Sequence, residues 1–375
     1  MTPRVAIVCS GLGHVLRGNE TWAATVGEGL HKSGGNVIVF GSGARPQARS
    51  PYVRVPCWRR DGWIRKFVSW DKAYLWEQIT FARNLRKHLR PDRFDLVHTA
   101  DPNLAQQLIA HTKKQGLGLI YQDSLLIGPA WCSKFENVQV LAPNYEDDAR
   151  KQGVTTRGWR AIPQMVDTRK FSPDGNKEAI RKRLFSGAID RNAEVVLAVG
   201  DFSASGGKRL DWIIAEAAKA KEPLHLVFVG NASKEECERL RAVGEKTLKG
   251  RVHFLTDVPH EQMADVFRAA DLFAHAALRE PFGLVLIEAM ASGLPVIAHD
   301  FETTRWIVGD GGRILNMSAS GELAASLDVF LANEGERMKV SAAAISRARS
   351  VFDAQAVLPK YHEWHAELTA GLQRQ

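Results

Sequence analysis

The chain has 375 residues, of which 45% are hydrophobic and 25% are charged. This composition excludes a disordered chain, a collagen and a disulfide scaffold, and it suffices for one large or two medium domains with a buried core. The four cysteines are widely spaced and form no CxxC pair, so they predict neither a zinc site nor a disulfide framework. We therefore expect a cytoplasmic protein.

Charge is distributed unevenly along the chain. The formal charge of the whole chain is +8, but residues 1–170 carry +11 and residues 171–375 carry −3. Since net charge affects association rather than fold, the two halves are expected to face different partners. The apolar run at residues 5–9 is too short for a signal peptide core, and no apolar run approaches the roughly 18 residues of a membrane span.

The first 165 residues alternate short apolar runs with helical patterns. This alternation is typical of a parallel sheet with helices packed on it. Residues 159–173 then lose the periodicity and contain two prolines, so we place the domain junction there and predict a first domain over residues 1–165. Strands are predicted at 5–9, 37–40, 96–98, 119–121 and 139–142, and helices at 21–32, 71–89 and 102–114.

The same alternation restarts and predicts a second domain over residues 166–350. The predicted fold class is therefore α/β, with two doubly wound Rossmann-like domains. Since such domains bind ligands beyond the carboxyl ends of their strands, two of them facing each other would form one cleft. Strands are predicted at 195–199, 224–229, 252–254, 272–276 and 295–298, and helices at 209–220, 234–243, 261–269 and 284–291.

The most informative motif is REPFGLVLIEAMASGLP at residues 279–295, in which Glu280 and Glu288 lie eight positions apart. Pro281 and Gly283 predict a turn, followed by a buried helix whose N-terminus opens near Glu280. Unpaired N–H groups at a helix start suit phosphate or sugar oxygens, and the two oxygens of Glu288 could accept both hydroxyls of a ribose. The structural alternative is that Glu280 complements the helix dipole and Glu288 is a paired acid.

This motif and the pattern around it, from AADLFAHAALREPFGL to IVGDGGRIL, resemble the E-x7-E signature of retaining nucleotide-sugar glycosyltransferases with the GT-B fold, glycosyltransferase family 4 in particular. The resemblance implies that Glu280, with Phe282, Gly283 and Leu284, contacts the donor sugar. It implies that Glu288 holds the nucleotide ribose. The resemblance extends to a helical pattern around residues 359–368, and we predict that a helix over 351–375 packs back toward the N-terminal domain.

A glycine-rich loop, GDFSASGGKR at residues 200–209, lies between a predicted strand and a predicted helix. Glycines let the backbone approach a phosphate closely, and Lys208 adds positive charge. The loop resembles the family's diphosphate loop, which implies that Lys208 is catalytic and that Gly206, Gly207 and Arg209 contact the donor. The family often has an arginine directly after the strand glycine, where this chain has Asp201. The alternative is a surface turn.

The loop after the first strand, GLGHVLRGNE at residues 11–20, is not a dinucleotide fingerprint, because Leu16 stands where a third glycine would be required. In the resembled family this loop approaches the donor phosphates and the acceptor, and Gly13 is a candidate for close approach to the donor. For the histidines, a purely structural role is the alternative. Candidates on the acceptor side are His14, Asn19, Glu20, His98, Gln122 and Asp123, with Gln122 at the position of the family's histidine near the reacting carbon.

A basic stretch runs from Arg54 to Arg93, with eleven Lys and Arg against four acids and four of the ten tryptophans. Basic residues interleaved with tryptophan suit an anionic membrane surface, a lipid-linked acceptor or a phosphorylated glycan. The alternative is a solvated helix whose apolar stripe from Leu75 to Leu89 faces the core. Nucleic acid is not expected as a partner, since no recognised nucleic-acid module accompanies the stretch.

These patterns predict a retaining glycosyltransferase of the hexosyltransferase class, which moves a sugar from a nucleotide-diphosphate sugar to a glycan or lipid-linked acceptor. The nucleotide sugar is a co-substrate, and neither a cofactor nor a metal is expected, since no HxxxH or DxD string occurs. The location would be the inner face of the membrane if the basic stretch binds lipid. The alternative is a non-catalytic nucleotide-sugar-binding partner of another transferase, motivated by Asp201 and Gln122.

Overall fold

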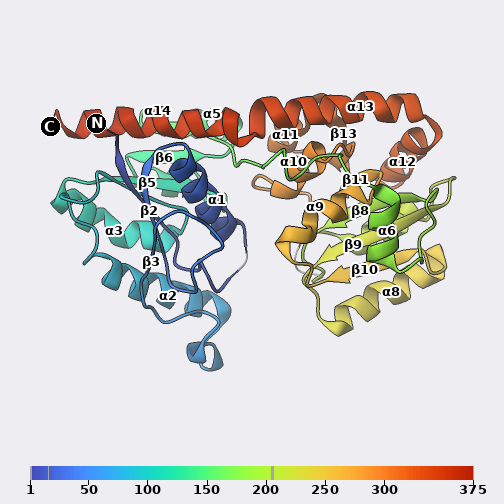
Figure 1. Cartoon of the computed structure of the whole chain (residues 1–375), viewed down its shortest axis with the longest axis horizontal. Helices are drawn as coiled ribbons and strands as arrows, with labels where there is room; N and C mark the ends of the chain where they lie inside the picture. Colours follow the sequence, from blue (N-terminus) through green and yellow to red (C-terminus); the bar gives the residue numbers. More distant parts are fainter. Residues whose placement is uncertain (1, 16, 204–206, 375) are drawn as a thin grey trace. The chain divides into compact units, whose positions relative to one another are not determined.

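A computed structural model of the chain describes residues 2–15, 17–203 and 207–374. The chain forms two compact units (Figure 1). Unit 1 contains Met1–Gln164 and Ala354–Gln375, and unit 2 contains Met165–Asp353. The division therefore falls within the segment where the periodicity of the sequence is lost, and the C-terminal helix belongs to unit 1.

Unit 1 is built on a seven-stranded sheet with the order β3-β2-β1-β4-β5-β6-β7, and every pairing is parallel. The chain order reverses between β1 and β4, which pair from Val5 with Leu96 to Val8 with Thr99. The central strands are aliphatic and buried, as expected of a sheet covered on both faces. The strands are β1 (Arg4–Val8), β2 (Asn36–Gly41), β3 (Tyr52–Arg54), β4 (Leu96–Thr99), β5 (Gly118–Asp123), β6 (Asn137–Val140) and β7 (Trp159–Ala161).

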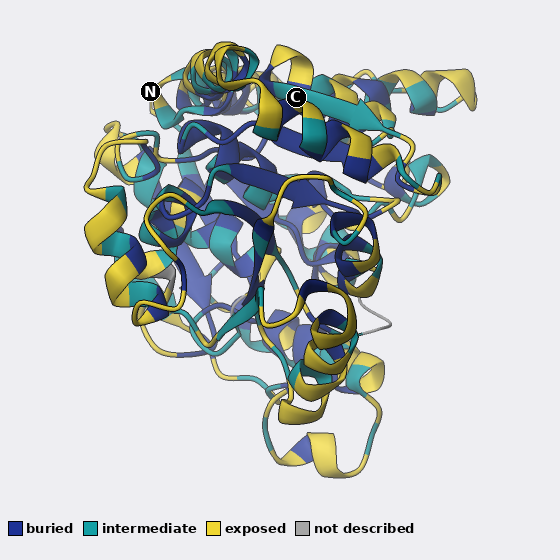
Figure 2. Ribbon diagram, turned by 90° about the vertical axis from the view of Figure 1, so that its right-hand side faces the viewer, coloured by how far each residue is buried: buried dark blue, intermediate teal, exposed yellow. Residues whose placement is uncertain are grey.

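The helices of unit 1 cover this sheet, and Figure 2 shows buried strands and helices with exposed outer faces. Local chemistry sets their ends: α3 has Pro102 in its first turn and stops at Gly116, whose left-handed φ of 66° suits glycine. None of the described helices is long and apolar enough to cross a membrane. The helices are α1 (Gly18–Lys32), α2 (Trp70–Leu85), α3 (Pro102–Gln115), α4 (Pro129–Cys132), α5 (Pro143–Lys151) and α14 (Ala354–Leu372), with a 3-10 helix η1 (Trp63–Lys66).

The C-terminal helix α14 is anchored in unit 1 by buried polar contacts. Tyr361 lies at their centre, because its hydroxyl accepts hydrogen bonds from Trp22 Nε1 at 3.1 Å and from Gln139 Nε2 at 2.8 Å. Trp364 and His365 flank it, both buried. Since Trp22 lies on α1 and Gln139 on β6, one side chain of α14 joins two distant parts of the unit.

Unit 2 repeats the architecture with a six-stranded parallel sheet in the order β10-β9-β8-β11-β12-β13. The reversal here falls between β8 and β11, which pair through Leu272 with Val196 and Phe273 with Leu197. The two doubly wound sheets confirm the predicted α/β fold class. The strands are β8 (Glu194–Val199), β9 (Leu224–Gly230), β10 (Val252–Thr256), β11 (Leu272–His275), β12 (Val296–His299) and β13 (Gly312–Leu315).

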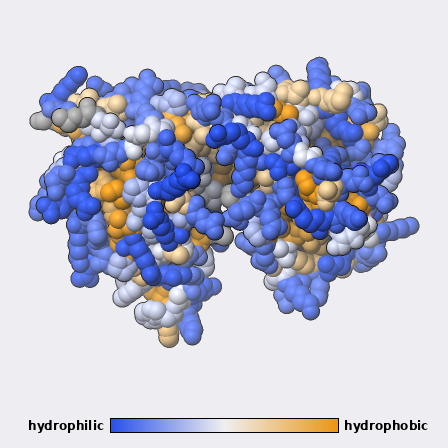
Figure 3. Space-filling model, in the orientation of Figure 1, coloured by the Kyte–Doolittle hydropathy of each residue, from blue (hydrophilic) through white to orange (hydrophobic). Residues whose placement is uncertain are grey.

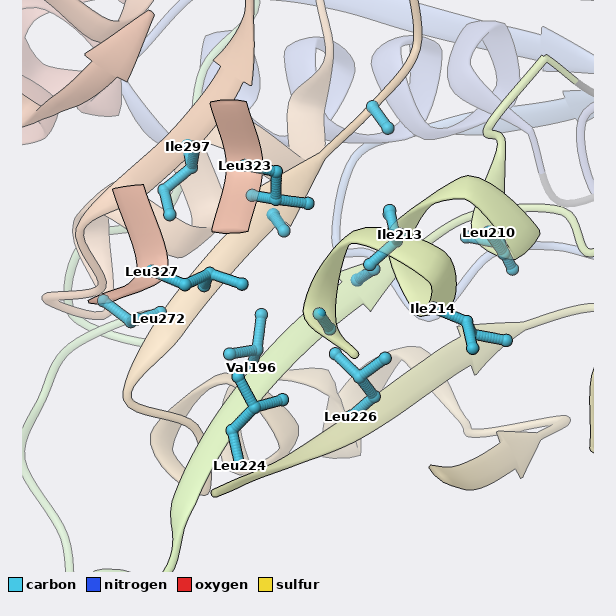
Figure 4. Close-up of a cluster of buried hydrophobic side chains, with 14 of the residues drawn as sticks. Val196, Leu210, Ile213, Ile214, Leu224, Leu226, Leu272, Ile297, Leu323 and Leu327 are labelled. Carbon is cyan, nitrogen blue, oxygen red and sulfur yellow. The ribbon is translucent and has the colours of Figure 1, made fainter. Parts of the chain in front are cut away.

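The core of unit 2 lies where α7 and α12 pack against these strands, and Figure 4 shows Val196, Leu226 and Leu272 facing Ile213 and Leu327 there. Tight packing of aliphatic side chains from several elements fixes the strand ends above which ligands bind. The helices of unit 2 are α6 (Lys177–Phe185), α7 (Leu210–Ala217), α8 (Lys234–Leu248), α9 (Met263–Arg268), α10 (Leu284–Ala291), α11 (Glu302–Val308), α12 (Glu322–Ala332) and α13 (Glu334–Arg347), with short turns η3 (His260–Gln262) and η4 (Gly309–Gly311) and a π-helical turn η5 (Ala348–Phe352).

Several elements differ from the predictions. The edge strands β3, β7 and β13 were not predicted, because each has only three or four residues and too few for an apolar pattern. Helix α2 ends at Leu85 rather than at 89. The predicted core-facing stripe is confirmed at Ala82, Leu85 and Leu89, which are buried, but it was wrong at Leu75, which is 38% exposed.

We predict that Tyr361→Phe destabilises unit 1. The variant leaves the buried Trp22 Nε1 donor without its acceptor, which costs about 1–3 kcal/mol. Urea unfolding followed by fluorescence measures the change. His362→Ala on the same helix is the control, because it removes only an exposed contact with Ser33 and is expected to cost less than about 0.5 kcal/mol. Equal costs in both variants would contradict the anchoring role of Tyr361.

Candidate active site

The candidate site of unit 2 lies where the strand order reverses. The loop after β8 and the loop after β11 leave neighbouring parallel strands at the same edge of the sheet. In doubly wound folds this reversal is where ligands bind, because the two loops diverge and leave room between them. The first loop carries Lys208 and the second carries Glu280, so the fold brings together two motifs that are 72 positions apart.

Glu280 is the centre of the site. Its oxygen Oε2 accepts hydrogen bonds from Lys208 Nζ at 2.6 Å and from His275 Nε2 at 3.0 Å. Burial alone would raise the pKa of this carboxyl, but the hydrogen bond and charge of His275 and the charge of Lys208 lower it to about 2. Glu280 is therefore ionised at neutral pH, and its other oxygen, Oε1, has no hydrogen-bond partner among the described residues.

Two glycines shape the site. Gly283 has a left-handed φ of 82°, and a Cβ there would lie 3.0 Å from Cγ of Glu280, so a side chain would displace the carboxylate. Gly200 lies under the stem of Lys208, where a Cβ would lie 2.8 Å from its Cγ. Glycine at these two positions keeps Lys208 and Glu280 within hydrogen-bonding distance.

The remaining motif residues lie at the start of α10. Phe282 is 2% exposed, and its ring packs edge-on against Phe352 with centroids 5.9 Å apart. Only the backbone of Phe282 is therefore placed to contact a ligand. Gly283 and Leu284 form the helix start and are half-buried. This end of α10 has no side-chain cap, which leaves N–H groups for a ligand.

Glu288 lies on the second turn of α10 and differs electrostatically from Glu280. Burial raises its pKa to about 8, and the positive charge of Lys170 only partly opposes the shift. None of the described residues donates a hydrogen bond to its carboxyl group. The group is therefore largely protonated at pH 7, when it offers both a hydrogen-bond donor and an acceptor.

The glycine-rich loop is only partly described, and Gly206 lies outside the described residues. Gly207 has a φ of 73°, with open space where a Cβ would be. The Arg209 guanidinium donates to the carbonyl of Met317 at 2.6 Å and lies 4.6 Å from the centre of the Trp212 ring. Asp201 accepts a hydrogen bond from the backbone of Ser203 at 2.8 Å, the short turn typical of aspartate.

Unit 1 has a buried charged network at the equivalent edge of its sheet, which the sequence analysis missed. Arg60 is 3% exposed, and its guanidinium donates to Glu77 Oε1 at 3.0 Å and to Glu20 Oε1 at 2.9 Å. Gly11 makes room for this pair, since a Cβ there would lie 2.0 Å from Glu20 Oε1. Burial, together with the charge of Asp101, raises the pKa of Glu20 to about 7, although Arg60 opposes the shift.

The network extends to His14, whose Nε2 donates to Glu77 Oε2 at 2.9 Å with only 1% of the side chain exposed. Burial would raise the pKa of Glu77, but the hydrogen bond from His14 and the charge of Arg60 hold it below its usual range. Gly13 packs against the backbone of the next loop, where a Cβ would lie 2.1 Å from the carbonyl oxygen of Ala44. Arg60 was counted in the basic stretch from Arg54 to Arg93. Because it is buried in this network, it does not contribute to an exposed basic surface.

Two predicted acceptor-side residues, His98 and Gln122, are fully buried and cannot contact an acceptor in this conformation. His98 packs edge-on against Trp22 at 5.1 Å and lies 3.4 Å from His365, and burial holds its pKa well below the usual range. Among the described residues, none forms a hydrogen bond with either polar atom of the buried Gln122 side chain. The physical reason is that both lie on strands beneath the helices, one residue before the end of the strand.

Asn19 and Asp123 lie closer to the strand ends. Asn19 Nδ2 donates to the carbonyl of Ala100 at 3.1 Å, and its Oδ1 accepts from Ser124 Oγ at 2.6 Å. Asp123 is 8% exposed and accepts from Cys132 Sγ at 3.4 Å, and burial raises the pKa of its carboxyl. Within the described ranges, no cluster of three or more His, Cys, Asp and Glu side chains is suited to a metal ion.

Comparison with known families agrees with the geometry of unit 2. Residues 179–347 match the model of the family "Glycosyl transferases group 1". This segment contains β8, β11 and α10 together with Lys208, His275, Glu280 and Glu288.

Curated relatives include several sugar transferases. The chain is 35% identical over 156 residues to mannosylfructose-phosphate synthase of Agrobacterium fabrum, which covers 39% of this chain and 33% of that protein. It is 25% identical over 370 residues to phosphatidyl-myo-inositol mannosyltransferase of Mycolicibacterium smegmatis, covering 92% and 89% of the two chains. A third relative is D-inositol 3-phosphate glycosyltransferase of Nocardia farcinica. The chain covers only 33% of the length of the Agrobacterium protein and 43% of the length of the Nocardia protein.

Solved structures share the fold over the whole chain. Sucrose-phosphate synthase from Thermosynechococcus elongatus superposes with a TM-score of 0.81 at 20% identity, covering 98% of this chain and 100% of that one. The Anabaena protein HepE, solved in complex with UDP and glucose, superposes with a TM-score of 0.77 at 16% identity, covering 97% and 100%. The chain has the GT-B fold, and its residues 179–347 match the model of the glycosyl transferases group 1.

Proposed function

We propose that this protein transfers a sugar, with retention at the anomeric carbon, from a nucleotide-diphosphate sugar to a glycan or lipid-linked acceptor. The observation that carries the proposal is the arrangement of Lys208 and His275 on one oxygen of Glu280, above the strand reversal of unit 2. Oε1 of Glu280 is left to accept a hydroxyl of the donor sugar. Supporting the nature of the donor, the structural relative HepE was solved with UDP and with UDP-glucose.

In this proposal Lys208 has two roles. In the free protein it neutralises Glu280, and with donor bound its ammonium group stabilises the charge that develops on the leaving diphosphate. The bond between the anomeric carbon and the phosphate oxygen breaks while the acceptor oxygen attacks from the same face. The acceptor proton passes to the leaving phosphate oxygen, so no protein base is needed, and the uncapped start of α10 adds N–H groups without a metal.

The acceptor side of the proposal concerns unit 1. Its formal charge is +10, against −2 for unit 2, which suits an acceptor bearing phosphate. One relative that matches over most of its length is named as a mannosyltransferase acting on phosphatidyl-myo-inositol. The alternative of a non-catalytic partner subunit is not favoured, since Lys208, Glu280 and Glu288 are all present and Lys208 contacts Glu280.

We expect Glu288→Ala to weaken nucleotide binding. Loss of a hydrogen bond to a charged group costs about 1.5–3 kcal/mol, or roughly 10- to 100-fold in Kd. A ribose diol donating to both oxygens favours the ionised carboxylate, so binding by the wild type should release a proton and tighten as the pH rises toward about 8. Calorimetry with UDP, GDP and ADP at several pH values tests this. Glu302→Gln, an exposed acid on α11, is the control, and an unchanged Kd in Glu288→Ala would contradict the assignment.

Lys208→Met should reduce turnover of the donor more than it weakens donor binding. Removal of one group that stabilises a developing charge typically costs roughly 10²–10³ in kcat. A panel of UDP-, GDP- and ADP-sugars with mass-spectrometric detection of donor consumption gives the measurement. The matched control is Lys182→Met, an exposed lysine on α6. Equal kcat values for Lys208→Met and wild type would rule out the catalytic role.

His275 is proposed as a positioning residue that acts through Glu280. Its loss in His275→Leu removes the hydrogen bond that helps to lower the pKa of Glu280 to about 2. Because activity requires ionised Glu280 and is lost as the pH falls through that pKa, the acid limb of kcat/KM should move to higher pH. His275→Gln retains an N–H donor and should move the limb back. A purely structural role would lower activity in His275→Leu without moving the acid limb.

A further inference from the structure

Exposed aromatic side chains are concentrated in one short segment of unit 1. Within the described ranges, all the large aromatic residues that are exposed lie between residues 58 and 76: Trp58 at 45%, Trp63 at 62%, Phe67 at 76% and Trp76 at 42%. Leu75 joins them at 38%. These five residues, called the aromatic patch below, surround η1, the small blue helix at the bottom of Figure 1, and the same end of the surface is pale to orange in Figure 3.

The aromatic patch is held together by ring contacts. Trp58 lies 6.1 Å from Trp63 and 5.7 Å from Trp76, and Trp63 lies 6.1 Å from Phe67, measured between ring centroids. The base of the segment is fixed in the unit by buried Ile64 and by the ion pair of Arg60. An anchored segment therefore holds the rings in solvent. Exposed apolar patches of this kind mark sites of interaction with a protein or a membrane.

Basic side chains border the aromatic patch. Arg65, Lys66 and Lys72 are exposed, and among the described residues none of them forms an ion pair. Arg59 is already paired with Asp61 at 2.6 Å, and Asp71 is the other acid in the segment. The exposed charge at the patch is thus positive, in a unit whose formal charge is +10.

We propose that the aromatic patch docks on an anionic lipid bilayer, with Trp63 and Phe67 entering the interface and Arg65, Lys66 and Lys72 contacting lipid phosphates. Segments that bind at a membrane interface combine tryptophan and phenylalanine with lysine and arginine. A protein partner fits less well, because lysine is depleted at protein interfaces. This inference goes beyond sugar transfer and is independent of the donor site in unit 2.

Sedimentation of the full chain with lipid vesicles tests the docking. The wild type is expected to sediment with vesicles of phosphatidylcholine mixed with phosphatidylglycerol, and less with phosphatidylcholine alone. Trp63→Ala combined with Phe67→Ala should abolish sedimentation while leaving nucleotide binding unchanged. Met338→Ala, at a residue that is 63% exposed in unit 2, is the matched control and should sediment as wild type. Quenching of tryptophan fluorescence by brominated lipid should fall in the double variant alone.

The charge contribution is tested separately. Arg65→Gln with Lys66→Gln should weaken partitioning to anionic vesicles roughly 25-fold, about fivefold per residue, and added salt should reduce the difference. Lys113→Gln with Lys114→Gln, an exposed pair on α3, removes the same charge away from the patch and is expected to have a smaller effect. The proposal is overturned if the wild type does not sediment with anionic vesicles at low salt. It is also overturned if the aromatic variant binds as wild type, or if it instead abolishes a dimer seen by analytical ultracentrifugation.

Discussion

Buried carboxylates at the carboxyl ends of the sheets are the constraint around which both units are organised. Removing a carboxylate from water costs several kcal/mol unless a cation is held against it in good geometry. Unit 2 meets this condition with Lys208 and His275 on Glu280, and unit 1 meets it with Arg60 on Glu77 and Glu20. In both units glycine makes the contact possible, because Gly283 and Gly11 leave the space that the carboxylates occupy.

The two glutamates of the motif show how much the partner matters. Glu280 and Glu288 lie eight positions apart and are both largely removed from water, yet the pKa of Glu280 is about 2 and that of Glu288 is about 8. The difference arises because two nitrogens donate to Glu280, whereas no described residue donates to Glu288. Glu280 stays ionised and therefore suits a contact that is kept throughout a reaction. Glu288 can ionise when a ligand supplies hydrogen-bond donors to its carboxyl group.

Much of the fold could be predicted from the sequence, because parallel strands and amphipathic helices leave strong periodic patterns, and the β8 and α10 patterns carried the family's motifs. The edge strands β3, β7 and β13 were too short to leave a pattern. Arg60 and Glu77 were only counted among the charges of the basic stretch, since an arginine in such a stretch gives no signal that it will pair with a carboxylate on the next helix. His275 was not considered, because only the path of the loop after β11 shows that its side chain meets the carboxylate of Glu280, five positions further along the chain. His98 was weighed as a site residue, but Trp22 and residues of α14, the latter more than 250 positions away, pack against it in the core.

Charge counted along the chain is therefore a poor guide to charge available at a site. In unit 1, the guanidinium of Arg60 is used internally, so the positive field comes from the exposed residues near η1 and the end of α2. In unit 2, Lys208 is already neutralised by Glu280 before any diphosphate arrives. In the proposed reaction the donor phosphate shares Lys208 with Glu280, and His275 continues to donate to the carboxylate while the lysine is shared. A single lysine can serve the ground state and the leaving group in turn because a second nitrogen donates to the same carboxylate oxygen.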